Sequence, residues 1–273
     1  MATVDRPDGV SLHVDERGEG PLVALAPYWS GNPGVYEELL AELARDHRVL
    51  TYDARGMGRS TREGPYDMAT DCADMEAVLE EAGGPAVVLG VGDGCNRAVH
   101  VAAARPDLVA AVVAFGTGPL ARMHFAGRDG MIASDAVVDA FLKMCDRDYR
   151  GALRTLLTAT NEQMDEDELR ERVASQLEYA PQEAAVPRVR EWAEDDPTEA
   201  ARAIGDRLWI LSSPDVAGPW LPPLEERRRV VQEVTPQARV EEHGPGQGPL
   251  SRPALVANRI RQVTATVGLG SRT

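Results

Sequence analysis

Residues 87 to 97 read Val87-Val-Leu-Gly-Val-Gly-Asp-Gly-Cys-Asn-Arg97, an apolar strand that runs into a glycine-rich turn and then a helix. In the pattern Gly-x-Nuc-x-Gly, a turn of this kind lifts one reactive side chain into a pocket and is called a nucleophile elbow. Gly90 and Gly94 supply the flanking glycines, and the residue between them is Gly92, which has no side chain. The sequence therefore indicates an enzyme scaffold that lacks its usual nucleophile.

Strands and helices alternate on both sides of this turn. Apolar runs predict strands at residues 22–26, 48–52, 87–89, 110–115, 208–211 and 238–242, and helical spacing predicts helices at residues 33–44, 70–82, 94–104 and 255–263. This alternation indicates a mostly parallel sheet. Helical patterns dominate from residue 119 to residue 204. We therefore expect a core domain of residues 1–118 and 205–273 and a helical cap of residues 119–204.

Three motifs together resemble those of the α/β-hydrolase fold family, and the resemblance covers essentially the whole chain. Residues 17–29 resemble the first strands that lead to the family's oxyanion loop, and Asp53-Ala-Arg-Gly-Met-Gly-Arg-Ser60 matches its D-x-R-G-x-G-x-S turn. The elbow at residues 90–94 is the third motif. The resemblance implies an α/β fold with a mostly parallel central sheet, flanking helices and a cap over the pocket.

Two registers are open at the elbow. Aspartate is the nucleophile in family members that open epoxides or cleave carbon–halogen bonds, so Asp93 is one candidate. That register places Val91 where the tight turn favours a small residue, whereas the register with Gly92 as the lifted residue places Gly90 there. The second register is favoured, and it assigns Gly92 to the nucleophile position.

The resemblance also places the other two members of a catalytic triad. Asp215 follows a late strand, where the family carries its acid. The family's histidine follows the last strand in a Gly-His-x-Pro context, and here Gly246-Gln-Gly-Pro249 puts Gln247 at that position. Glutamine cannot take up a proton near neutral pH, and His243 is a less favoured substitute because it falls within the strand. Without serine and histidine the acyl-enzyme mechanism cannot operate, so an ordinary serine esterase is excluded.

The oxyanion loop departs from the family as well. Pro27 and Tyr28 stand where the family has His-Gly, and Trp29 follows them. Pro27 has no N–H, but the backbone N–H groups of Trp29 and Asp93 can still form an oxyanion hole. The aromatic pair suits stacking on a flat ligand or a phenol donor from Tyr28, and the equal alternative is that both rings fill the space of a lost catalytic loop.

Asp93 is the best remaining chemical group, as a base or a hydrogen-bond acceptor, although capping the helix is an equal alternative. The expected catalytic residues are Asp93, Tyr28 and Gln247. The expected substrate-binding residues are Trp29, Pro27, Gly92, His124, Asp215 and Trp220. No cofactor and no metal site are expected, and His13 and His47 are expected at the surface.

Composition limits the partners. A net charge of −15 argues against nucleic acid and anionic membranes. Three widely spaced cysteines without a CxxC pair fit a reduced, cytoplasmic setting, and the N-terminal residues do not form a signal peptide. The expected partner is a hydrophobic small molecule, and a homodimer is left open.

Three functions remain. The leading hypothesis is a non-hydrolytic, cofactor-independent enzyme of bacterial, actinobacterial-type natural-product biosynthesis. It would promote cyclisation, rearrangement or C–C or C–O bond formation on a hydrophobic, polycyclic aromatic substrate. The first alternative is a non-catalytic protein that binds or senses a small molecule. The second alternative is an Asp93-dependent hydrolase of epoxides or halides.

Overall fold

The computed structural model describes residues 2–115, 135–160, 164–212, 224–242 and 252–269. One eight-stranded sheet runs through the molecule in the order β1-β2-β4-β3-β5-β6-β7-β8. Its strands are β1 (Ala2–Asp5), β2 (Ser11–Arg17), β3 (Leu22–Leu25), β4 (Arg48–Tyr52), β5 (Ala86–Gly90), β6 (Val109–Phe115), β7 (Leu208–Ser212) and β8 (Arg239–Glu242). β2 is antiparallel to both β1 and β4, and the remaining pairs are parallel.

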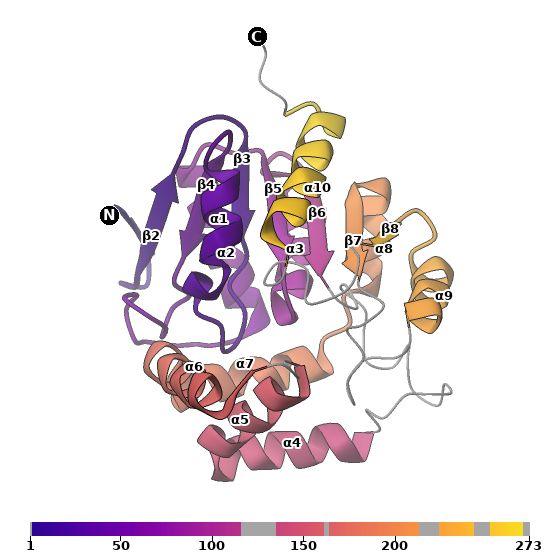
Figure 1. Ribbon diagram of the computed structural model, residues 1–273. Coiled ribbons are helices and arrows are strands. Elements are labelled where there is room, and N and C mark those ends of the chain that lie inside the picture. The colour runs from indigo at the N-terminus through magenta and orange to yellow at the C-terminus, as the bar shows by residue number, and fades with distance from the viewer. Residues whose placement is uncertain (1, 116–134, 161–163, 213–223, 243–251, 270–273) are drawn as a thin grey trace.

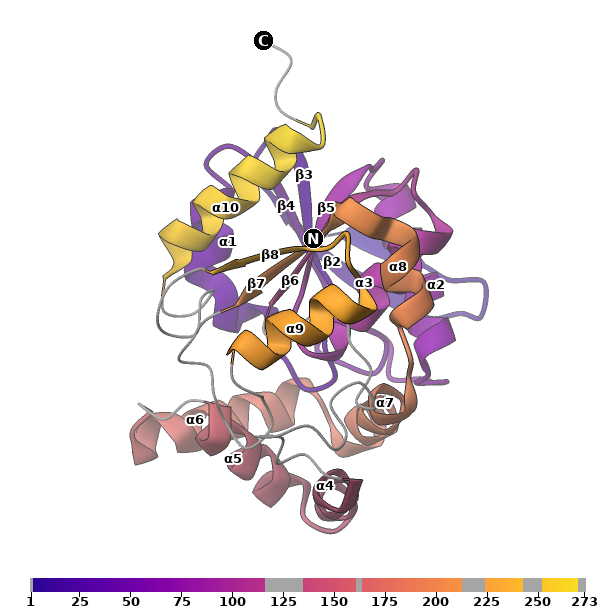
Figure 2. The same cartoon turned by 90° about the vertical axis from the view of Figure 1, so that its right-hand side faces the viewer.

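Helices cover both faces of the sheet (Figures 1 and 2). α1 (Glu37–Leu43), which follows a short 3-10 turn (η1, Pro33–Tyr36), and α10 (Pro253–Thr266) cover one face. α2 (Met68–Glu81), α3 (Asp93–Ala104), α8 (Thr198–Ile204) and α9 (Leu224–Val234) cover the other. Along β5, Val87 and Leu89 pack toward α1 and α10, whereas Ala86 and Val88 pack toward α3. Burial on both faces explains the unbroken apolar runs of the parallel strands.

The helices α4 (Asp135–Arg147), α5 (Tyr149–Thr160), α6 (Glu166–Tyr179) and α7 (Gln182–Glu194) lie together at one end of the sheet and form the cap (Figure 1). The cap has its own apolar core, in which Trp29 of the sheet domain also packs. α8 differs from its expected place in the cap. Its Ala201 and Ile204 pack with α3 in the core beneath the sheet, so the cap helices end with α7.

The structure differs from the sequence-based prediction in the N-terminal region and at two histidines. β1 and β2 were not expected, because β2 mixes charged and apolar residues (Ser-Leu-His-Val-Asp-Glu-Arg). His13 lies in β2 and is buried, and its backbone N–H donates to Ser60 Oγ at 2.8 Å. His47 is buried as well, because its ring is hydrogen-bonded to Asp46 at 2.7 Å and to Thr264 at 3.0 Å. The expectation that both histidines are exposed was wrong.

Among the described helices, none combines the length and the apolar character needed to cross a membrane.

Candidate functional site

The turn between β5 and α3 has the backbone geometry of an elbow. Gly92 is the residue before α3 and has φ +54° and ψ −130°. Residues that carry a side chain rarely adopt this backbone conformation. A Cβ on Gly90 would lie 2.7 Å from the Cα of Cys95, and one on Gly94 would lie 3.0 Å from the carbonyl oxygen of Ala26. Both flanking positions therefore exclude a side chain.

Gly92 itself faces open space. It is exposed, and a Cβ built on it would have no described atom within 4 Å. The tight turn thus brings one backbone position to an open surface, where members of this kind of elbow carry a nucleophile. Here that position offers only hydrogen.

Asp93, the next residue, has both carboxylate oxygens engaged. Its side chain is 0 % exposed. Oδ1 accepts the backbone N–H of Trp29 at 2.9 Å, and Oδ2 accepts Nη2 of Arg97 at 2.5 Å. The Trp29 N–H, which the sequence suggests as an oxyanion-hole donor, is therefore already bound to an internal carboxylate. Burial raises the pKa of Asp93, and the opposing effects of Arg97 and the Trp29 N–H do not cancel that rise.

Asp93 is the first member of a buried chain of alternating charges, which we call the Asp–Arg chain (Asp93, Arg97, Asp71 and Arg188). Arg97 Nε donates to Asp71 Oδ2 at 3.0 Å. Arg188 donates to both oxygens of Asp71, from Nε at 2.7 Å and from Nη2 at 2.6 Å. All four side chains are buried, and their charges sum to zero. The two arginines lower the pKa of Asp71 despite its burial.

The Asp–Arg chain connects the elbow to the cap. Asp93 and Arg97 lie on α3, Asp71 lies on α2, and Arg188 lies on the cap helix α7. Arg97 also donates from Nη1 to the carbonyl oxygen of Pro27 at 2.6 Å, which fixes the loop before Trp29. Each guanidinium thus has partners on at least two elements, as buried charges require.

The two aromatic residues of the oxyanion loop have different surroundings. Trp29 is 6 % exposed, and its ring contacts Phe141 and Tyr149 of the cap, with centroid separations of 6.2 and 6.4 Å. This packing favours the space-filling alternative for Trp29. Tyr28 is half-buried, and its ring lies over Gly31 and meets the ring of Tyr36 edge-on at 6.2 Å.

The hydroxyl of Tyr28 is a proton donor at neutral pH. Burial raises its pKa to about 12, and the side chain of Tyr36 opposes this rise through a hydrogen bond. Of the aromatic pair, Tyr28 is the residue that keeps some of its surface open. Pro27 is buried, and its carbonyl oxygen faces Arg97 instead of a ligand.

Four of the expected site residues lie outside the described residues: Gln247, His124, Asp215 and Trp220. His243, the alternative base, lies outside them as well. Their roles stay predictions.

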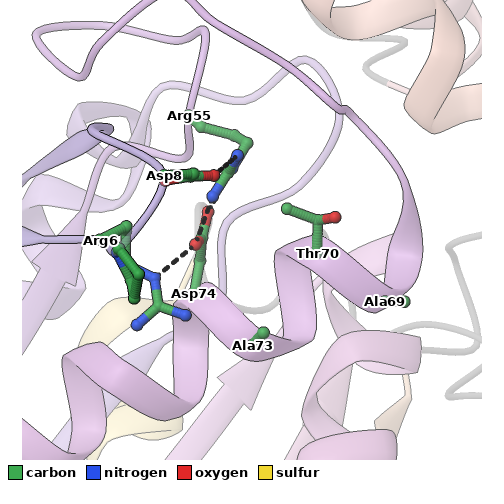
Figure 3. A pocket seen from close by; sticks show the side chains of 8 residues that line it. Arg6, Asp8, Arg55, Ala69, Thr70, Ala73 and Asp74 are labelled. Carbon is green, nitrogen blue, oxygen red and sulfur yellow. Dashed lines mark hydrogen bonds and ion pairs between the residues drawn. The ribbon is translucent and has the colours of Figure 1, made fainter.

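The D-x-R-G-x-G-x-S turn (residues 53–60) is hydrogen-bonded to the cap. Asp53 accepts the Tyr179 hydroxyl and the Arg59 N–H, each at 3.0 Å, and this joins the turn to cap helix α6. Arg55 binds Asp74 with two hydrogen bonds, of 2.7 and 2.8 Å. A cavity of about 400 Å³ beside this pair is lined by residues including Arg6 and Asp8 (Figure 3). Its charged side chains pair with one another, so we assign it a structural role.

Other reactive groups are poorly placed. Burial raises the pKa of the Cys95 thiol to about 12, which disfavours a thiolate. In the part of the chain that the structure describes, no cluster of three or more His, Cys, Asp or Glu side chains could hold a metal ion.

Sequence reasoning missed Arg97, Asp71 and Arg188 as partners of Asp93 at the site. One signal was available, because Asp93 and Arg97 stand four positions apart on one helix and can therefore form a pair. The partners on α2 and α7 are far away in sequence, and nothing local indicates them.

Comparisons with known proteins agree with the fold. The alpha/beta hydrolase fold family model matches residues 22–200. The 2-(acetamidomethylene)succinate hydrolase of Mesorhizobium japonicum is 35% identical over 112 residues, which are 40% of this chain and 40% of that protein. Polyketide synthase ThaQ of Burkholderia thailandensis is 32% identical over 136 residues, 46% of this chain and 6% of that protein. The chain thus spans less than half the length of these curated relatives.

Solved structures extend the similarity to the whole fold. An esterase from Exiguobacterium antarcticum superimposes with a TM-score of 0.78 at 19% identity, and the match covers 96% of this chain and 99% of that one. At this identity the likeness concerns the fold alone. With the family match over residues 22–200 and the eight-stranded sheet, this chain belongs to the α/β-hydrolase fold family.

Proposed function

We propose that this chain is a non-hydrolytic family member that binds a small molecule between its sheet and its cap. The observation that carries the proposal is the hydrogen bond from the Trp29 N–H to the Asp93 carboxylate, beside a turn residue that has no side chain. Acyl transfer needs a nucleophile at the turn and free N–H donors for the developing oxyanion. At this elbow the first is missing at Gly92, and one donor is taken by the Asp93 side chain.

The buried position of Asp93 also speaks against an Asp93-dependent epoxide or halide hydrolase. A carboxylate nucleophile must reach the substrate with one free oxygen, and both oxygens of Asp93 face protein donors. The same bonds leave neither oxygen of Asp93 free to take a proton from a substrate.

A second candidate is an enzyme that uses no covalent nucleophile, acting in natural-product biosynthesis on a hydrophobic substrate. Tyr28 favours it, since a half-buried phenol that stays protonated at neutral pH can donate a hydrogen bond to a carbonyl group of a ligand. The partial match to polyketide synthase ThaQ fits such a setting. In this candidate, Gln247 would add a second polar group, and Asp93 would hold the loop in place.

The test is native mass spectrometry of the purified protein after incubation with extracts of its producing organism. A ligand recovered unchanged supports binding, and a ligand recovered chemically altered supports the second candidate. In parallel, hydrolysis of p-nitrophenyl butyrate is measured. Hydrolysis of this ester by the wild type that is abolished by a substitution within residues 90–94 would overturn the proposal.

A matched pair of variants locates the ligand. Gly92→Leu places a side chain in the open space at the elbow and should remove the bound ligand. Gly83→Leu is the control, because Gly83 is also exposed, also has a positive φ (+71°) and also has open space around its Cβ, but lies at the end of α2 away from the cap. If both variants keep the ligand, the open space beside Gly92 is not its site.

A further inference from the structure

Two polar side chains on cap helix α6 are not satisfied by the fold. Gln176 is only 4 % exposed, and its Oε1 has no hydrogen-bond partner among the described residues. Arg172 is half-buried, and within the described ranges it forms neither an ion pair nor a hydrogen bond. The two residues stand four positions apart, so they share one face of the helix.

This face of α6 is turned toward the sheet domain at the Asp53 turn. Three positions after Gln176 it continues to Tyr179, whose hydroxyl donates to Asp53. The positive charge of Arg172 acts on the hydroxyls of Tyr28 and Tyr36, where it opposes the rise that burial causes in their pKa values. Arg172 and Gln176 therefore lie on the face of α6 that meets the sheet domain.

Four buried side-chain atoms of the described residues lack a hydrogen-bond partner, and only one of them, Gln176 Oε1, is an oxygen; the others are His13 Nε2, Arg48 Nε and Trp209 Nε1. The three fully buried arginines of this protein, Arg55, Arg97 and Arg188, all bind aspartate side chains. A buried amide oxygen without a donor destabilises the folded state by about 1–3 kcal/mol. Polar groups that remain unsatisfied at such a cost are typical of sites that a ligand completes.

We propose that Arg172 and Gln176 form a subsite for a ligand that carries a carboxylate next to a hydroxyl or amide N–H group. The guanidinium binds the carboxylate, and Gln176 Oε1 accepts the neighbouring donor. The subsite rests on the proposed function, and it narrows the ligand to hydroxy acids or N-acylated amino acids.

The experiment measures binding of a matched set of probes by saturation-transfer NMR and calorimetry. The set contains mandelate, methyl mandelate, which lacks the negative charge, and phenylacetate, which lacks the hydroxyl. An aliphatic set of 2-hydroxyisocaproate, its methyl ester and isocaproate is measured beside it. In at least one set, the hydroxy acid should bind at least about tenfold more tightly than its ester, because a charge-assisted pair is lost in the ester.

Variants assign this preference to the two residues. Arg172→Gln should remove the preference for acid over ester, Arg172→Lys should keep part of it, and Gln176→Leu should remove the preference for the hydroxylated acid. Arg170→Gln is the control, because Arg170 lies on the same helix, is exposed and pairs with Asp167 at 2.8 Å. Arg170→Gln should leave both binding preferences unchanged.

The outcomes separate the subsite from the broader proposal. If acids and esters bind equally, or if Arg172→Gln leaves the preference intact, the subsite is refuted while small-molecule binding stands. If no probe binds but a neutral ligand is recovered from extracts, the subsite alone is likewise refuted. If neither probes nor extracts yield a ligand, both fail.

Discussion

Asp71→Asn tests whether the Asp–Arg chain holds the elbow and the cap together. The Asp71 carboxylate accepts three hydrogen bonds, one from Arg97 at 3.0 Å and two from Arg188 at 2.7 and 2.6 Å. Asparagine keeps one acceptor oxygen and turns an NH₂ group toward guanidinium donors, so at least one charge-assisted bond is lost and two buried cations face one carboxylate. Breaking a buried pair in this way costs about 3–5 kcal/mol.

Unfolding in guanidinium chloride measures this loss in the free energy of unfolding. In thermal unfolding, Tm should fall by roughly 10 °C. Arg188→Gln should lower the free energy of unfolding by a similar amount. The loss in the double variant should be at least about 1 kcal/mol smaller than the sum of the two single losses, because Asp71 and Arg188 share one interaction. Arg170→Gln, which removes an exposed pair, should stay within about 1 kcal/mol of the wild type.

The pH dependence gives a second check. The pKa of Asp71 is lowered from 3.8 in the folded state, so its contribution to stability is fully present above that pH and is lost as the pH falls below it. The difference between wild type and Asp71→Asn should therefore stay constant at neutral pH and shrink only as the pH falls below about 4. A loss below about 1 kcal/mol at neutral pH, or strictly additive variants, would refute the reasoning.

Three further predictions follow from the site. Gly92→Ser should not hydrolyse p-nitrophenyl butyrate above the rate in buffer, because Asp93 occupies the Trp29 N–H, and measurable turnover by this variant would contradict that reason. Gln176→Leu should raise the free energy of unfolding by about 1–2 kcal/mol, because it removes an unsatisfied buried oxygen, and a drop in Tm would contradict this. Burial raises the pKa of Cys95 to about 12, so it should react with a thiol reagent such as DTNB at pH 8 only after unfolding; rapid labelling of the native protein would speak against it.

The central strands could be predicted from sequence, because β5 and β6 are buried on both faces and their apolar runs are continuous. The elbow could be predicted as well, since Gly90 and Gly94 are required by close contacts with neighbouring backbone. β2 could not, because its burial comes from packing against β4 and the turn at Ser60, neither of which is visible in its own residues.

The interactions of the site were harder to predict than its position. That Asp93 would bind the Trp29 N–H depends on one side-chain rotamer and on a contact between residues 64 positions apart. His47 shows the same difficulty, because its burial depends on Thr264, which is 217 positions away. Polarity alone suggested exposure for that histidine, and the tertiary contact reversed it.

The Asp–Arg chain limits how the residues around the elbow can change. A free Trp29 N–H requires Asp93 to change. Changing Asp93 alone leaves Arg97 with a single carboxylate partner in a buried setting, and changing Arg97 next leaves Asp71 with only Arg188. Each single substitution thus passes through a less stable protein. Substitutions at the elbow on α3 are therefore coupled to substitutions on α2 and on the cap helix α7.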